Sequence, residues 1–97
     1  MHIGVCKLTL RIPENQSLKG KRRVLHSLCQ RVRSKFGVSI AEVDSNEAWQ
    51  IATLGMVCVS GSARHADEML NSAIAYIESS RQDVELVDVE QETITGF

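Results

Sequence analysis

The segment WQIATLGMVCV, which runs from Trp49 to Val59, decides the fold because it is apolar on both faces. Successive side chains of a strand point to opposite sides of the sheet. One side of this strand would carry Ala52, Leu54, Met56 and Cys58, and the other Ile51, Val57 and Val59. Such a pattern is typical of a strand that is central in its sheet or covered on both sides. We therefore expect nearly all of this segment to be buried.

Three further strands are indicated around this segment. Residues 38–43 are β-branched and precede the polar turn 44–47, which predicts a hairpin with the central strand. Residues 3–12 alternate between apolar and polar until Pro13 ends the strand. The last strand covers residues 84–94. It would carry Val87 and Val89 on one face and Asp88, Glu90 and Glu92 on the other, where they could meet Lys7 and Arg11 of the first strand.

Two helices are predicted between these strands. The first would begin after Ser17, whose hydroxyl can cap its first turn, and run to about Phe36. Gly37 follows directly and suits a left-handed cap. The second helix would follow the break at residues 60–62. Its apolar residues repeat at helical spacing and are Ala63, Ala66, Leu70, Ala73, Ile74 and Ile77.

The resulting order, β-α-β-β-α-β, predicts an α+β fold. Its compact form is a ferredoxin-like sandwich, in which a four-stranded antiparallel sheet carries two helices on one face. The first and third strands are central in this topology, in agreement with the doubly apolar third strand. The chain has 97 residues, of which 43% are hydrophobic, and this suffices for one core. We therefore expect a single domain over residues 1–97.

The charges of the chain are strongly segregated. Seven of the eleven Lys and Arg residues lie between Lys19 and Lys35, and no acid occurs from Asn15 through Ala41. That segment carries +7, whereas the remaining four cations and twelve acids sum to −8. Polarisation of this kind indicates a surface that faces a polyanion.

Helical spacing divides these cations into two groups. The side opposite the apolar stripe, called the basic face below, consists of Lys19, Arg22, Arg23, His26 and Arg33. We predict that these residues bind nucleic-acid phosphates, with His26 contributing charge only when protonated. The alternative is an ordinary solvated helix exterior. Lys21 is a sixth candidate, but it falls within the apolar stripe, where a structural ion pair with Glu42 is an equally good interpretation.

Three segments together resemble the bacterial YlxP-like family, a domain of unknown function. They are SLKGKRRVLHSL at residues 17–28, FGVSIAEVD at 36–44 and WQIATLG at 49–55. The resemblance implies a ferredoxin-like domain. It also implies a role in ribosome maturation or translation, because members are often encoded beside translation initiation factor 2 and ribosome-binding factor A. The chain departs from the family at Gly20, where an acidic residue is usual.

Three functions are compatible with these features. We expect a binding protein for RNA or a ribosomal subunit, and not an enzyme. The alternative is a homodimer or other protein-interaction module that uses an open sheet face with Val5, Thr9, Ile51, Val57 and Val59. A small enzyme of the acylphosphatase kind is less well supported, since RIPENQSLKGK at residues 11–21 is not a glycine-rich anion loop.

The remaining residues indicate little further chemistry. The three cysteines are widely spaced and are interpreted as buried thiols, and His2 and His65 lack companions at ligand spacing. We therefore predict no metal and no small-molecule cofactor. Trp49 opens a strand after a polar turn, where it could be a partly exposed contact residue, although packing against the end of the sheet is the more common arrangement. No apolar run approaches the roughly 20 residues that cross a bilayer, and we expect a cytoplasmic protein without membrane contact.

Overall fold

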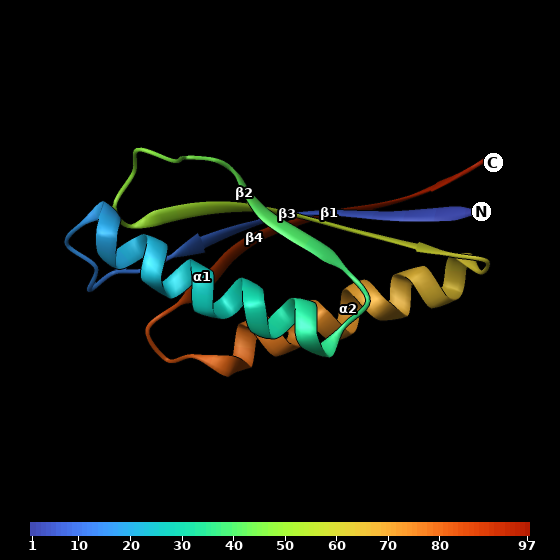
Figure 1. Ribbon diagram of the computed structural model, residues 1–97. Helices are drawn as coiled ribbons and strands as arrows, with labels where there is room; N and C mark the ends of the chain where they lie inside the picture. The colour runs from blue at the N-terminus through green and yellow to red at the C-terminus, as the bar shows by residue number, and fades with distance from the viewer.

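The computed structural model describes residues 1–97 and contains six elements (Figure 1). They are β1 (His2–Arg11), α1 (Leu18–Lys35), β2 (Ser39–Asp44), β3 (Ile51–Ser60), α2 (Ala63–Ser80) and β4 (Glu85–Thr95). The strands form one antiparallel sheet in the order β2-β3-β1-β4. Both helices lie on the same side of this sheet. The predicted α+β ferredoxin-like fold, with the first and third strands in the centre, is confirmed.

The hydrophobic core fills the space between the sheet and the two helices. β1 and β3 contribute Cys6, Leu8, Leu10, Ala52, Leu54, Met56 and Cys58. The helices close the core with Leu25, Leu28, Cys29, Val32, Ala66, Leu70, Ala73 and Ile77. All three cysteines are buried free thiols, as predicted. Neither helix has a stretch long and apolar enough to cross a membrane.

The far face of the sheet is bare, which corrects one prediction. Val57 and Val59 were expected to be buried, but their exposed fractions are 40% and 60%. The reason is that both helices pack on the other side, so β3 is central within the sheet without being covered on both faces. This uncovered side is called the open face below.

A bulge in β4 corrects a second prediction. Val87 and Val89 were placed on one face by simple alternation, but the ladder between β1 and β4 shifts register between Thr9 and Leu10. Leu10 consequently pairs with Leu86, and Val89 packs against the core while Val87 is exposed. An extra residue in one strand reverses the faces of the residues beyond it.

The ends of α1 agree with the prediction at one terminus only. Ser17 is the N-cap, and its hydroxyl accepts a hydrogen bond of 2.9 Å from the Gly20 N–H. At the other end the predicted left-handed cap at Gly37 is wrong. The helix ends because Phe36 turns extended, with its ring packed edge-on against Tyr76 at 5.7 Å between centroids.

Candidate functional site

The outer surface of α1 forms an exposed array of positive charge. The buried side of the helix comprises Lys21, Leu25, Leu28, Cys29 and Val32. Every residue of the basic face is exposed, as are the neighbouring Arg31 and Lys35. The first turn contains no acid, and Arg33 and Lys35 lie in the last turn. Helical geometry spreads the charges from Lys19 to Arg33 over about 21 Å of surface.

The cations of the basic face lack carboxylate partners. All four cations outside α1 form an ion pair, namely Lys7 with Glu90, Arg11 with Glu85, Arg64 with Glu68 and Arg81 with Asp83. Of the seven cations on α1, only Lys21 does so. Solvent-facing helices usually mix signs, because neighbouring opposite charges stabilise a helix slightly. The basic face therefore differs from the rest of the molecular surface.

Two cations near the end of α1 have other partners. Arg33 donates from Nη2 to the Ile40 carbonyl of β2 at 2.6 Å. Lys35 lies over the Tyr76 ring, 5.2 Å from its centroid. Lys35 is thus partly engaged in a cation–π contact, whereas the guanidinium of Arg33 keeps further N–H groups for a ligand.

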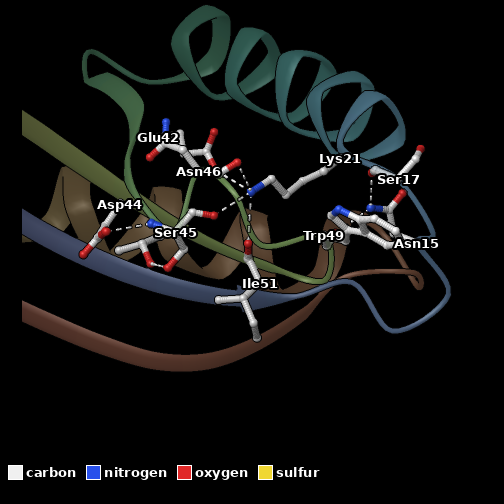
Figure 2. A network of polar contacts seen from close by, with 10 residues as sticks. Asn15, Ser17, Lys21, Glu42, Asp44, Ser45, Asn46, Trp49 and Ile51 are labelled. Carbon is white, nitrogen blue, oxygen red and sulfur yellow. Dashed lines mark hydrogen bonds and ion pairs between the residues drawn. The ribbon is translucent and has the colours of Figure 1, made fainter.

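Lys21 is not part of this surface, and its assignment as a phosphate-binding residue is wrong. Its exposed fraction is 1%, and its ammonium lies 2.8 Å from Glu42 Oε2. That oxygen makes no aligned hydrogen bond, so the contact is an ion pair. The same ammonium donates to the carbonyls of Ser45, Asn46 and Ile51 at 2.8, 3.3 and 3.3 Å (Figure 2). The alternative structural interpretation of Lys21 is confirmed.

The loop between β2 and β3, residues 45–50, is fastened to the start of α1. Lys21 holds its two ends, and Asn15 Nδ2 donates to the Trp49 carbonyl at 2.5 Å and to the Ser17 carbonyl at 2.7 Å. Gln50 Nε2 donates in turn to the Asn15 carbonyl at 3.0 Å. This loop lies beside the first turns of α1, at the end of the sheet opposite the chain termini (Figure 1).

Trp49 is exposed in this loop, against expectation. Its exposed fraction is 55%, so the favoured expectation of packing against the end of the sheet is wrong, and the alternative of a partly exposed side chain is what the structure shows. Asn15 fixes the backbone at Trp49 by donating to its carbonyl, and the indole remains in solvent. The sequence carried one signal for this arrangement, because Trp49 lies between a polar turn and the start of β3.

The open face has a charged part and an apolar part. The predicted meeting of β1 with the acids of β4 is confirmed for Lys7, whose Nζ lies 2.9 Å from Glu90 Oε2. Arg11 pairs instead with Glu85 at 3.3 Å. Near the termini, the register brings an apolar patch together across three strands, consisting of Ile3, Val5, Val57, Val59 and Ile94.

The other reactive groups are buried or isolated. Burial raises the pKa of Cys6 to about 11 and also raises the pKa values of Cys29 and Cys58. These thiols are accordingly protonated near neutral pH, unlike reactive cysteines, whose pKa is lowered. No group of three or more His, Cys, Asp or Glu side chains could hold a metal ion.

Comparison with known proteins identifies the family. Residues 3–91 match the family model described as "Protein of unknown function (DUF503)". The chain is also similar to the "Uncharacterized protein YlxP" of Bacillus subtilis (strain 168). The two are 36% identical over 77 residues, which cover 79% of this chain and 84% of that protein. The chain therefore belongs to the DUF503 family of YlxP-like proteins, as the motifs at residues 17–28, 36–44 and 49–55 indicate.

Proposed function

We propose that this protein binds the RNA of a ribosomal particle in the cytoplasm through the basic face of α1, and that it acts by binding and not by catalysis. The carrying observation is the absence of carboxylate partners on this face, while every cation elsewhere on the chain has one. Charges left free in this way are available for phosphates. The ribosomal partner follows from the family resemblance.

The mode of binding would be contact with phosphates. Lys19, Arg22, Arg23 and Arg33 are borne on a rigid helix, and the partial positive charge at its N-terminus adds to theirs. A helix surface without aromatic residues cannot stack bases as the central strands of an RNA-recognition motif do. Recognition by this face would accordingly depend on charge and shape.

Salt dependence tests this proposal. Four phosphate contacts predict that log affinity falls against log salt with a slope of about −2.8 for single strands and about −3.6 for a duplex. The variant R22E/R23E/R33E should lose most of the affinity and of the slope. The variant K7E/R11E/R64E is the control, because it makes the same change in net charge on other surfaces. An unchanged slope and affinity in the first variant would refute the proposal.

Cosedimentation with ribosomal subunits tests the partner. The protein should pellet with subunits at low salt and be released at high salt, since the contacts displace counterions. The variant R22E/R23E/R33E should remain in the supernatant at both salt concentrations. Equal pelleting of this variant and the wild type would contradict binding through the basic face.

The second candidate is a homodimer formed through the open face. It is favoured by the apolar patch, in which Val59 and Ile94 flank Ile3 and have exposed fractions of 60% and 40%. A second copy could cover this patch with its own. Sedimentation equilibrium should then show a dimer at high micromolar concentration and a monomer for V57K/V59K. A wild-type protein that remains monomeric would exclude this candidate, which is compatible with the first.

A further inference from the structure

Trp49 is an exposed residue to which the proposed function gives no role. It is the only tryptophan of the chain, and an exposed fraction of 55% is high for so large an apolar side chain. Its backbone is nevertheless held firmly, because the carbonyl of Trp49 accepts a hydrogen bond from Asn15 and the carbonyls of Ser45, Asn46 and Ile51 accept from Lys21. The indole is thus an exposed ring on a fixed support.

The support depends on a glycine in the first turn of α1. A Cβ atom at Gly20 would lie 2.3 Å from Asn15 Oδ1, so any side chain there would displace the Asn15 amide. With glycine at this position, the amide can reach both the Ser17 and the Trp49 carbonyls (Figure 2). The departure from the family's usual acidic residue therefore has a consequence for Trp49 as well as for the helix.

The surroundings of Trp49 indicate what its ring would contact. Asn15 and Ser17, which lie beside it in Figure 2, lead directly into the helix that carries Lys19, Arg22 and Arg23. An RNA whose phosphates lie on these cations would bring adjoining nucleotides to the loop. Glu47 lies two residues before Trp49, and Glu14 is adjacent to Asn15, whose side chain donates to the Trp49 carbonyl. Both acids disfavour a phosphate at the ring itself. A base, which is uncharged, suits that position.

We propose that Trp49 stacks on an unpaired base of the RNA whose adjoining phosphates are bound by the start of α1, with Asn15 and Gly20 as positioning residues. This inference rests on the proposed function and narrows its ligand to RNA with unpaired nucleotides at the end of the basic face. Base–aromatic stacking tolerates any base, because each has a π-face. The protein would thus select an RNA by its secondary structure, an unpaired base beside the bound phosphates, and not by its base sequence.

The emission of the single tryptophan reports directly on stacking. The full chain would be titrated with a stem-loop RNA whose loop contains adenines, with the same stem-loop carrying an abasic loop, and with a blunt duplex. The adenine loop should quench the emission of Trp49, whereas the abasic loop and the duplex should not. Anisotropy of labelled RNA should show that the abasic loop binds about 5- to 150-fold more weakly than the adenine loop.

Variants separate stacking from folding. Trp49→Ala should bind the adenine loop as weakly as the wild type binds the abasic loop, and Trp49→Phe should restore much of the affinity. Gly20→Ala and Asn15→Ala should reduce both the quenching and the preference for the adenine loop, while duplex binding is unchanged. Gly61→Ala is the matched control, because a Cβ atom at Gly61 would meet no atom within 4 Å.

The outcomes distinguish this inference from the proposed function. Equal quenching by adenine and abasic loops, or wild-type affinity of Trp49→Ala, would overturn stacking and leave the basic face intact if R22E/R23E/R33E still loses duplex binding. If that triple variant binds as the wild type does, both proposals fall. A blue shift of the emission that depends on protein concentration and not on RNA would assign Trp49 to a protein contact and overturn stacking.

Discussion

The two populations of cations on this protein differ in what surrounds them. Everywhere outside α1, each cation has a carboxylate oxygen within 3.3 Å. On the outer surface of α1, none has. The same residue types thus occur in a neutralised and an unneutralised setting on one small domain. Ion pairs at exposed positions contribute little to stability, so the difference concerns what each surface can bind.

Neighbours within α1 show the same contrast at closer range. Lys21 is buried and surrounded by four oxygens, whereas Arg22 is exposed and has no partner. Adjacent residues of a helix point about 100° apart, so one faces the loop at residues 45–50 and the other faces solvent. A cation in this segment is therefore structural or available for binding according to its place on the helix.

The largest effect should come from replacing Lys21, the buried one of these two neighbouring residues. Lys21→Met leaves Glu42 and three carbonyls without their cation, and should lower the free energy of unfolding by about 3 kcal/mol. The estimate is at the lower end for buried pairs because the Glu42 side chain keeps an exposed fraction of 20%. Arg22→Met is the control and should change stability by less than about 0.5 kcal/mol. Urea denaturation measures both, and similar values for the two variants would contradict this difference.

A smaller effect should follow from supplying the basic face with an acid. Lys19→Glu places a carboxylate in the first turn, where it favours the helix dipole and can pair with Arg23 one turn later. The free energy of unfolding should rise by about 0.5–1 kcal/mol. The slope of log RNA affinity against log salt should become shallower by the amount that about one phosphate contact contributes. Lys19→Gln removes the cation without adding an acid and should weaken binding without the gain in stability. Parallel losses of stability and affinity would refute this separation.

The smallest effect concerns a neutralised pair and depends on pH. Arg81 donates to both carboxylate oxygens of Asp83 at 2.8 Å, and this hydrogen bonding lowers the pKa of Asp83 below its ordinary value of 3.8. Folding therefore favours the ionised form. The stabilisation is present above the unfolded-state pKa and is lost as the pH falls through the lower folded-state value.

Comparison of the wild type with Asp83→Asn tests this dependence. The wild type should be more stable by less than about 1 kcal/mol near neutral pH, and the difference should disappear in strong acid. Denaturation curves across this range measure it. A difference that grows as the pH falls would show that Asp83 is not held in its ionised form by Arg81.

Much of the fold was predictable because local patterns and topology agree. The alternation of β1, the cap at Ser17 and the doubly apolar β3 each indicated an element, and together they left one compact arrangement. The bulge in β4 was missed, although the consecutive apolar residues Leu86 and Val87 interrupt the alternation at that point. The exposure of Val59 was missed for another reason, since apolarity does not reveal which face the helices cover.

The candidate site was predictable in its helix and not in its loop. Lys21 and the basic face lie on the same helix, so the helical spacing of the sequence alone was enough to place them on different sides of it. The loop that carries Trp49 is held by Asn15, which lies 34 positions earlier in the sequence. The Asn15 side chain donates to the Trp49 carbonyl and lies beside Gly20. Such a tertiary contact has no periodic signature. The sequence accordingly indicated the charges, whereas exposure of the aromatic ring beside them was the less favoured of two interpretations.

The hydrogen bond from Arg33 to the Ile40 carbonyl also has a consequence for self-association. β2 is an outer strand of the sheet, and an outer strand offers main-chain groups on which a strand of another molecule can add. Arg33 donates to one main-chain carbonyl of this outer strand and lies against it. A variant that removes this guanidinium exposes a template for aggregation at the same time as it removes a charge. Light scattering should therefore accompany every binding curve measured with R22E/R23E/R33E.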